Sequence, residues 1–490
     1  MLGLLGCAVP DDTGPGHDPP CTASAVLMEY NPLGALVTAR CTRPVDLQVA
    51  YGEAGDLDRS TPVRSAGVGV TEVEVLGLRP DRTVELSVEA LDEEGAWEVA
   101  TLEVAVPPLP DAWAGCEVSS VLDDPPWTAD EVVCFPAGHD EAHRPLRCFD
   151  RSGETVWALS LPEGMQAKSF RGLDDGSLVL VGGNSNRAVL VDAASRVKSN
   201  VTSFDFGTTR YAHDNIDGHD VSVIKDGPWT GMVAFLTAAF DRLPSGRQAV
   251  GSGIVVFDPV TREVVWDWSL HGELGDGEPI SPNLDCSNPG NCLYVNALAH
   301  EVDEDDRQSF WIERNNESQI HRVDIESGQV LWSLGSGGDF RLVDDLDAAD
   351  PADLPDEGWP TAPHGLVLLG RSGSRVRFML HDNAGAGLGG EDPGFSRVME
   401  YEIDESTLRA TIRLAHGGPD APLEARWFSP SGGSVQLLPD EVAFLFLKSE
   451  ADLFVSDVAY PEGSERWRIA CEDWRDAHRM AWFPSLYEMR

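Results

Sequence analysis

The stretch Val256–Trp268, VFDPVTREVVWDW, recurs in related form at Arg322–Leu334, RVDIESGQVLWSL, and at Cys148–Ser160, CFDRSGETVWALS. Each copy consists of an apolar residue, an aspartate, a tight turn and a strand that carries a tryptophan. Three weaker copies contain Asp192, Asp404 and Asp457. Their spacing is uneven, which a propeller with blade loops of variable length accommodates better than a solenoid of fixed repeat length. The repeat therefore predicts a six-bladed β-propeller.

We expect the propeller to occupy residues 114–490 and to close through its C-terminal strand. The first copy of the repeat, at Asp150, has no obvious innermost strand before it. The terminal segment HRMAWFPSLYEMR, residues 478–490, has no copy after it. This segment is expected to complete the first blade, because joining the two ends of the ring removes an open sheet edge.

Residues 22–106 precede the propeller and alternate apolar and polar side chains, as in VDLQVAYG at residues 45–52. This period of two is typical of strands that are buried on one face. The piece LRPDRTVELSVEA, residues 78–90, resembles the fibronectin type III signature, with Val84 where that family usually has tyrosine. A β-sandwich is therefore expected here, with residues 107–113 as the linker. The whole chain is predicted to be all-β.

The composition excludes two classes of partner. The 490 residues include 36 Lys and Arg against 82 Asp and Glu, a formal charge of −46. Nucleic acids and anionic membrane surfaces need basic patches, so neither is expected to bind this chain. An anionic substrate would require a local cluster of Arg, Lys or His.

Residues 1–21 have the character of a lipoprotein signal remnant followed by a flexible tether. MLGLLGC resembles the bacterial lipobox, whose cysteine, here Cys7, is lipidated. Six residues are too few for a signal peptide, so the true start codon is expected upstream. No later segment approaches the roughly 18 apolar residues of a membrane-spanning helix. We expect an exported periplasmic, outer-membrane or cell-surface lipoprotein, held to the membrane only by its lipid.

Without Cys7, eight of the nine cysteines remain, an even number that favours disulfides and an oxidising compartment. Connectivity cannot be deduced from sequence, and scattered free thiols are the alternative. Proximity and the remaining pair suggest four bridges: Cys21 with Cys41, Cys134 with Cys148, Cys286 with Cys292, and Cys116 with Cys471. The last of these would staple the seam of the ring.

In a propeller, each blade begins with an innermost strand that lines the central channel. Strands that precede each aspartate of the repeat begin with polar residues: Lys168, His219, Tyr294 with Asn296, His364, and Ser431. Equivalent positions on neighbouring blades lie at one depth around the axis. These side chains are therefore expected to converge at the channel mouth, where propellers bind ligands.

Several of these stretches resemble the bacterial arylsulfotransferases that work without the nucleotide donor PAPS. The resemblance rests on GHDVSVI, on the run from NALAHEVDEDD to LGSGGDF, on PHGLVLL followed by HDNAG, and on GGSVQLLPDEVAFL with the terminal HRMAWFPSLY. It implies an exported protein with a β-sandwich on a six-bladed propeller. It also implies transfer of a sulfuryl group from a phenolic sulfate ester to a phenol by a ping-pong reaction through a sulfo-histidine.

By this resemblance His364 matches the nucleophile, Arg314 the arginine of the Ser-Arg motif, His219 the histidine of the His-Asp strand, and Asn296 the asparagine. Weaker substrate-binding candidates are Tyr294, Lys168, Asp382 and Asn383. Three positions depart from the family pattern. Tyr294 stands where the family has histidine, Glu313 replaces a small residue before Arg314, and Gly365 follows His364.

The candidate residues suit the chemistry of sulfuryl transfer. A neutral imidazole attacks sulfur and divides the reaction into two steps. Arg314 offers a planar fork to the sulfuryl oxygens, and His219 and Asn296 can donate hydrogen bonds. The alternative is that these are channel-lining polar residues bonded through water. Histidines without such an argument are interpreted as structural: His300, His321, His381 and His416.

No cofactor or metal is expected. The acidic runs Asp303–Asp306 and Asp344–Glu357 could bind Ca²⁺, but they lack ordered ligand spacing and are better explained as solvated loops. Two other functions compete with sulfotransfer. The first is a surface-anchored propeller with a decayed active site that binds a ligand or a protein, which Tyr294 favours. The second is a quinoprotein dehydrogenase, against which the absence of an adjacent Cys-Cys pair and the six copies, rather than eight, both argue. Oligomeric state does not follow from the sequence.

Overall fold

The computed structural model describes residues 19–489, apart from short stretches and a few longer segments of the chain. These gaps are residues 94, 114–115, 121–127, 129, 137–144, 163, 183–185, 208, 212, 214, 243–247, 271–294, 315–316, 356–357, 384–394, 418–428, 430–431, 439–440, 448–452, 460–464 and 472–478. The described residues form β-strands and two short 3₁₀ helices, η1 (Asp111–Trp113) and η2 (Ser203–Phe206). The prediction of an all-β fold is confirmed. None of the helices among these residues is long and apolar enough to span a membrane.

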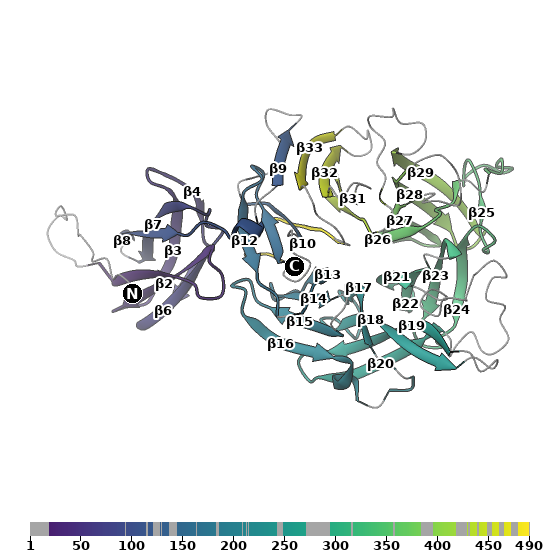
Figure 1. Cartoon of the computed structure of the whole chain (residues 1–490), viewed down its shortest axis with the longest axis horizontal. Helices are drawn as coiled ribbons and strands as arrows, with labels where there is room; N and C mark the ends of the chain where they lie inside the picture. The colour runs from purple at the N-terminus through teal and green to yellow at the C-terminus, as the bar shows by residue number, and fades with distance from the viewer. Residues whose placement is uncertain are drawn as a thin grey trace.

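The N-terminal part of the chain forms two sheets that enclose one core (Figure 1). One sheet has the order β1 (Cys21–Leu27), β2 (Gly34–Cys41) and β6 (Gly69–Leu76). The other has the order β4 (Asp56–Ser60), β3 (Val45–Glu53), β7 (Arg82–Asp92) and β8 (Gly95–Val106), with β5 (Arg64–Ala66) beside β3. Alternate residues of β3 and β7, such as Leu47 and Leu86, are fully buried, as the period of two predicted. The likeness of this unit to fibronectin type III domains stays a prediction.

The described residues after Trp113 form six sheets, here called sheets 1 to 6, which are antiparallel except for one short parallel strand pair in sheet 5. Sheet 1 contains β10 (Val132–Pro136), β11 (Leu146–Phe149), β12 (Thr155–Leu159) and β34 (Ala481–Phe483). Sheet 2 contains β13 (Ala167–Gly172), β14 (Leu178–Gly182), β15 (Arg187–Val191) and β16 (Val197–Thr202). Sheet 3 contains β17 (Asn215–Val223), β18 (Val233–Arg242), β19 (Gln248–Asp258) and β20 (Glu263–Ser269). Sheet 4 contains β21 (Val295–Val302), β22 (Gln308–Arg314), β23 (Gln319–Asp324) and β24 (Val330–Gly335). Sheet 5 contains β25 (Arg341–Leu342), β26 (Pro363–Ser372), β27 (Arg375–Asp382), β28 (Arg397–Asp404) and β29 (Arg409–Gly417). Sheet 6 contains β30 (Ser434–Leu438), β31 (Glu441–Leu447), β32 (Leu453–Ala459), β33 (Glu465–Cys471) and β9 (Cys116–Ser120).

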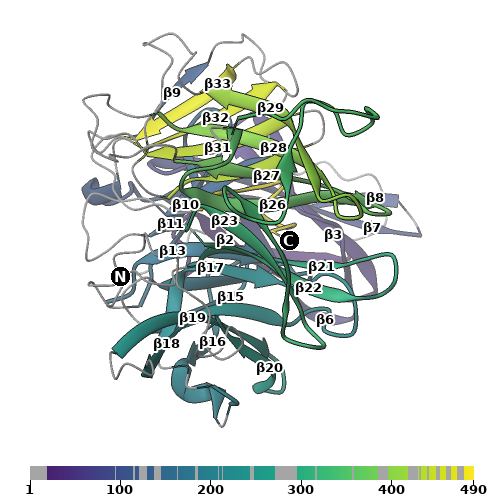
Figure 2. The ribbon, with the colours of Figure 1, turned by 90° about the vertical axis from the view of Figure 1, so that its right-hand side faces the viewer.

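The six sheets follow one another around a common centre (Figure 1). Seen at right angles, sheet 3 lies at the bottom and sheet 6 at the top (Figure 2). The strands nearest the centre contact one another in the order β13, β17, β21, β26 and β30. Residues that begin these strands are therefore brought together although they are far apart in sequence.

Both ends of this region take part in closing the ring. β34 pairs with β10 and so adds the last strand of the chain to sheet 1, the first sheet of the ring. β9, the first strand after the linker, pairs with β33 in sheet 6, which the sequence did not predict. Cys116 on β9 and Cys471 on β33 are paired residues in this ladder and form a disulfide. Two different strand pairings and one covalent bond thus hold the seam.

In sheets 1, 3 and 6 the tryptophan of the repeat connects the sheet to the next one. Indole Nε1 of Trp157 in sheet 1 donates to the carbonyl of Ala193 in the turn of sheet 2, at 2.7 Å. Trp266 of sheet 3 donates to the carbonyl of Ile325 in the turn of sheet 4, at 3.1 Å. Trp467 of sheet 6 donates to Arg151 in the turn of sheet 1, at 2.9 Å. The aspartate–turn–tryptophan repeat is therefore both a turn and a contact between sheets.

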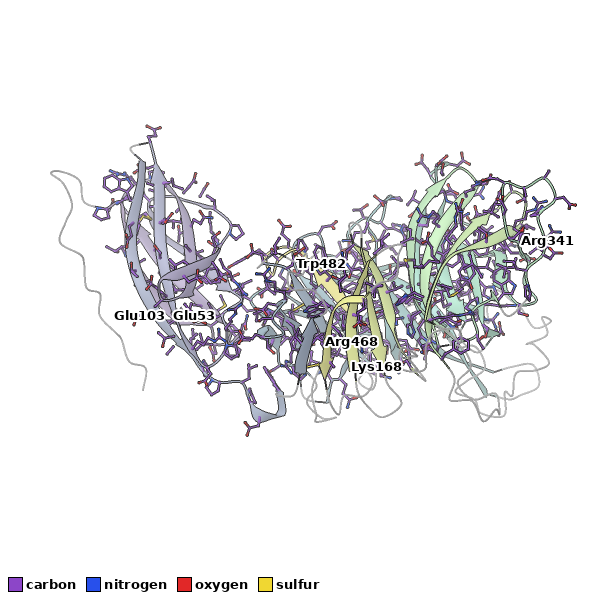
Figure 3. All side chains as sticks on the ribbon, turned by 90° about the horizontal axis from the view of Figure 1, so that it is seen from above. Glu53, Glu103, Lys168, Arg341, Arg468 and Trp482 are labelled. Carbon is purple, nitrogen blue, oxygen red and sulfur yellow. A yellow bond between two sulfur atoms is a disulfide. The ribbon has the colours of Figure 1, made fainter. Side chains whose placement is uncertain are left out.

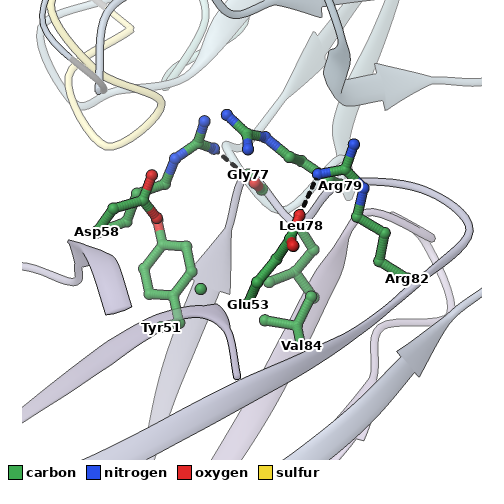
Figure 4. A pocket seen from close by; sticks show the side chains of 10 residues that line it. Tyr51, Glu53, Asp58, Gly77, Leu78, Arg79, Arg82 and Val84 are labelled. Carbon is green, nitrogen blue, oxygen red and sulfur yellow. Dashed lines mark hydrogen bonds and ion pairs between the residues drawn. The ribbon is translucent and has the colours of Figure 1, made fainter. Parts of the chain in front are cut away.

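The aspartate of the first repeat also holds the sandwich to the ring (Figure 3, where Glu53 and Glu103 mark the sandwich). Asp150 Oδ2 accepts Arg59 Nη2 at 2.9 Å and Arg79 Nη2 at 3.0 Å. Burial raises the pKa of Asp150, but the Ser152 hydrogen bond and the two guanidinium groups outweigh it, so the pKa is lowered. The arginines lie beside a small cavity that Tyr51, Glu53 and Leu78 also line (Figure 4). This junction is an ion-pair contact between domains.

The described cysteines form three disulfides: Cys21–Cys41, Cys116–Cys471 and Cys134–Cys148. These are three of the four pairs that the sequence suggested. The fourth pair, Cys286 with Cys292, and the lipidation candidate Cys7 lie outside the described residues.

Candidate active site

His364 is the second residue of β26, the strand of sheet 5 nearest the centre of the ring, and only 5 % of it is exposed. The ladder with β27 shifts register between His364 and Val367, so the backbone bends there. Gly365 has φ of +69°, and a Cβ on it would lie 2.7 Å from the Cα of Ser434. Only glycine allows this conformation and this close approach to sheet 6, which explains the residue that follows His364.

The two ring nitrogens of His364 have different partners. Nδ1 lies 3.2 Å from the carbonyl oxygen of Ala362, which can only accept a hydrogen bond. Nδ1 therefore carries the hydrogen of the neutral ring. Nε2 lies 3.0 Å from Nδ2 of Asn296, which donates to its lone pair. This arrangement selects the tautomer in which Nε2 is the nucleophilic nitrogen.

The surroundings of His364 keep its ring neutral. Burial, the positive charge of Arg479 and the neighbouring His381 lower its pKa to about 3, and His219 contributes in the same direction. His381, on β27, is fully buried, and its own pKa is also lowered to about 3 by burial and by Arg479. At neutral pH both imidazoles are uncharged, and the nearby positive charge is that of Arg479.

Asn296 and His219 lie on the innermost strands of the two preceding sheets, sheets 4 and 3. Asn296, on β21, is 1 % exposed and stands at a register shift between Val295 and Ala297. His219, on β17, also lies within a shifted stretch of the ladder, and its Nδ1 contacts the carboxylate of Asp217. Such register shifts turn side chains out of the regular ladder.

Arg314 contacts two side chains that follow it closely in sequence. At the end of β22, its Nη1 lies 3.3 Å from Nε2 of His321 and its Nη2 pairs with Glu317. Burial lowers the pKa of Arg314, and burial followed by the charge of Arg314 lowers that of His321 to about 3. The contacts shown for Arg314 are thus with Glu317 and His321, whereas Arg479 acts electrostatically on His364.

The weaker candidates differ among themselves. Lys168 lies on β13 at a register shift and is half-buried. Asp382 is fully buried and accepts Thr361 N at 2.9 Å and Arg397 Nε at 2.8 Å. Asn383 donates to the carbonyls of Ser429 and Gly432. Asp382 and Asn383 therefore hold backbone segments next to the site. Tyr294 and Ser431 lie outside the described residues.

Three buried ionisable residues near His364 were given no role in the site by the sequence. Arg479, 1 % exposed, lies just before the closing strand β34. Asp220 is fully buried and lies 3.0 Å from Arg171 and 3.4 Å from Arg479. Glu313 is fully buried, and burial together with the charges of Asp220 and Asp382 raises its pKa well above the ordinary value although Arg479 opposes the rise. All three lie within stretches that carry the family resemblance, and Glu313 is also one of the positions that depart from the family pattern.

The arrangement can do nucleophilic chemistry on an electrophile that bears negative charge. It combines a neutral imidazole, an amide donor, a buried cation and a buried carboxyl group with a raised pKa. Among the described residues, no group of three or more His, Cys, Asp or Glu side chains is placed to hold a metal ion. Fold and site together define an all-β, propeller-like protein with a histidine-centred site at the inner strands. Residues 121–469 match the family model described as Arylsulfotransferase (ASST), and the chain belongs to this family.

Solved structures show only distant similarity. A protein of unknown function from Bacteroides caccae is 11 % identical, with a TM-score of 0.35, and covers 72 % of this chain and 99 % of its own. The hydrazine synthase of Kuenenia stuttgartiensis is 10 % identical, with a TM-score of 0.37 and coverage of 66 % and 72 %. A virginiamycin B lyase from Staphylococcus aureus is 10 % identical, with a TM-score of 0.35 and coverage of 86 % and 99 %. No curated protein matches the chain. Function is therefore argued from the family and the site.

Proposed function

We propose that this protein transfers a sulfuryl group from a phenolic sulfate ester to a phenol acceptor, with His364 as the nucleophile of a ping-pong reaction. Membership of the arylsulfotransferase family supports the general activity. The single observation that carries the histidine mechanism is the hydrogen-bond arrangement of His364, which directs the lone pair to Nε2. A low pKa keeps that lone pair available at neutral pH.

In the first step, Nε2 of His364 attacks the sulfur of the ester. The N–S bond forms, the S–O bond to the aryl group breaks, and the phenolate leaves with the electron pair. Nδ1–H stays bonded to the carbonyl of Ala362 and stabilises the positive ring. Asn296 Nδ2, released from the lone pair, can donate to a sulfuryl oxygen.

In the second step, the oxygen of the acceptor phenol attacks sulfur, the N–S bond breaks and neutral His364 returns. The phenol must lose its proton and the first leaving phenolate must gain one. His219, oriented by Asp217, is the group proposed to carry this proton. Arg314 is proposed to hold the sulfuryl oxygens after exchanging its pairing with Glu317 for the substrate.

We also propose that the protein is exported and held to the membrane through Cys7. Three disulfides support an oxidising compartment, because such bonds are rare in proteins of the reducing cytoplasm. Incorporation of labelled palmitate in the expressing bacterium, and its loss in Cys7→Ala, would test the anchor. Wild-type protein that stays in the soluble cytoplasmic fraction would contradict it.

The test of the enzymatic proposal is release of p-nitrophenol from p-nitrophenyl sulfate in the presence of a phenol. We expect release by the wild-type protein, none by His364→Ala, and unchanged release by the control His416→Ala on the outer strand β29. Mass spectrometry of the quenched enzyme is expected to find one added SO₃ group on the His364 peptide. Turnover that survives in His364→Ala would rule out this nucleophile.

A second candidate is a binding protein whose active site has decayed. It is favoured by one observation, the tyrosine at position 294 where the family has histidine. Tyrosine can donate a hydrogen bond to an oxyanion, but it is neither a cation nor a base near pH 7. Absence of turnover in the wild type and its appearance in Tyr294→His would select this candidate.

A further inference from the structure

The centre of the site contains an arginine that the proposed reaction does not yet use. Arg479 is 1 % exposed and precedes β34, the strand that closes the ring. Burying a guanidinium group is costly unless its hydrogen bonds are made and its charge is compensated. The contacts of Arg479 therefore indicate what the residue does.

These contacts join three sheets. Nη2 donates to the backbone carbonyl of Asn296 at 2.6 Å, and Nη1 donates to that of Gly433 at 3.0 Å. Nη2 also lies 3.4 Å from Oδ2 of Asp220, which provides the opposite charge. Gly433 directly precedes β30 of sheet 6, whereas Asn296 belongs to sheet 4 and Asp220 to sheet 3.

Asn296 is thus held on two sides. Its position at a register shift of β21 takes it out of the regular ladder with β22. Arg479 holds its carbonyl oxygen, and its side-chain Nδ2 lies 3.0 Å from Nε2 of His364. A change in the position of the Arg479 guanidinium group is therefore transmitted to Nε2 of His364 through Asn296 alone.

We propose that Arg479 is a positioning residue, which holds the Asn296 backbone so that its side chain orients Nε2 of His364 and which makes this geometry depend on closure of the ring. The inference rests on the proposed function for the nucleophilic role of His364. Arg479 comes from the last segment of the chain, so the site is complete only when β34 has joined sheet 1. The lowered pKa of His364, to which Arg479 contributes, agrees with this proximity.

The test compares Arg479→Lys, which keeps the charge but loses the fork, with Arg479→Met, which loses both. We expect kcat for p-nitrophenyl sulfate to fall on the order of 100-fold in both, the loss caused by a misplacement of about 1 Å, with little change in KM. The ¹⁵N resonances of the His364 ring are expected to shift in both variants. Arg147→Met is the matched control, since Arg147 is a buried arginine of sheet 1 whose Nε bonds Thr155. It should alter neither readout.

Wild-type kcat and unchanged His364 resonances in folded Arg479→Lys would overturn the proposal. Should Arg479→Met fail to fold, a cycle of Arg479→Lys and Asn296→Ala decides the question. Because both act through one link, their effects on the His364 resonances should be non-additive, and additive effects would contradict the proposal. The resonances need no turnover, so a wild-type protein without activity would refute the sulfotransfer while the positioning role is still measured.

Discussion

At the scale of single residues, burial decides which groups of the site carry charge. His364 and His381 have pKa values of about 3, and Glu313 has a pKa well above its ordinary range. Imidazoles and carboxyl groups respond in opposite directions because burial always disfavours the charged form. The site therefore presents neutral imidazoles, and a carboxyl group with a raised pKa, beside the buried charges of Arg479 and Asp220.

We expect His364 to remain neutral, with its hydrogen on Nδ1, when the pH is lowered from 7 to 5. Its folded pKa lies below the ordinary 6.5, so its contribution to stability is present above pH 6.5 and is lost as the pH falls toward 3. ¹⁵N NMR of histidine-labelled protein measures this, with His364→Ala for assignment. A titration of His364 centred near pH 6.5 would contradict the buried arrangement.

Glu313→Gln is expected to stabilise the protein more at pH 8 than at pH 5. Because the folded pKa of Glu313 is raised, the folded chain keeps a proton that the unfolded chain has lost above its ordinary pKa of 4.5. Stability is thus lost as the pH rises, and glutamine avoids that loss. Denaturant unfolding at both pH values measures the effect, with the exposed Glu326→Gln as control. An effect independent of pH would show that Glu313 is ionised in the folded state.

At the scale of elements, the repeat works by joining neighbours. In sheets 1, 3 and 6 the tryptophan of the repeat reaches the aspartate turn of the following sheet, as Trp157 does with Ala193. The last contact, from Trp467 to Arg151, runs from sheet 6 back to sheet 1. Trp467 is fully buried, so the contact combines a hydrogen bond with packing of an aromatic side chain.

Trp467→Phe is expected to lower the free energy of unfolding by about 1–3 kcal/mol, from the lost hydrogen bond and the smaller buried side chain. Trp97→Phe is the control, because its indole donates to Asp92 within the same sandwich sheet and Trp97 is only partly buried. Chemical denaturation of both variants compares them. Equal losses of unfolding free energy in the two variants would mean that the hydrogen bond between sheets 6 and 1 stabilises the ring no more than a hydrogen bond within one sheet does.

At the scale of the whole molecule, the two ends of the ring are interlocked. β9 joins sheet 6, β34 joins sheet 1, and the disulfide between Cys116 and Cys471 spans a sequence separation of 355 residues. A crosslink that closes a long loop restricts the unfolded chain more than one that closes a short loop. The seam disulfide is therefore expected to contribute more than the hairpin disulfide Cys134–Cys148, with its separation of 14.

Replacing both Cys116 and Cys471 by alanine is expected to cost up to about 5 kcal/mol, against about 3 kcal/mol for Cys134 with Cys148. Thermal unfolding of the two double variants gives the order. If the hairpin pair costs more, the stability of the seam comes from its strand pairings rather than from the crosslink. Sulfotransfer by the seam variant at low temperature would report whether the site survives without it.

Much of this architecture was accessible from local patterns. Alternation of apolar and polar residues, turn residues after each aspartate and closely spaced cysteines are encoded over short stretches, so the all-β fold and the pairs Cys21–Cys41 and Cys134–Cys148 could be predicted. Cys116–Cys471 followed only as the remaining pair. His364, His219 and Asn296 were found because each lies in a segment expected to be the innermost strand of its blade, and because each matches the family pattern. The role of Arg314 toward the substrate stays a prediction, and its contacts with Glu317 and His321 could not be foreseen, since the direction of a side chain depends on strand register.

The amino-acid sequence by itself determined the strands, the repeat and the residue types of the site. Only the tertiary structure decided that Arg479, Asp220 and Glu313 meet there, that β9 crosses to sheet 6, and which nitrogen of His364 holds the lone pair. The reason is physical. Periodicity is a property of neighbouring residues, whereas burial, charge state and hydrogen-bond partner arise from segments that come together only when the ring closes.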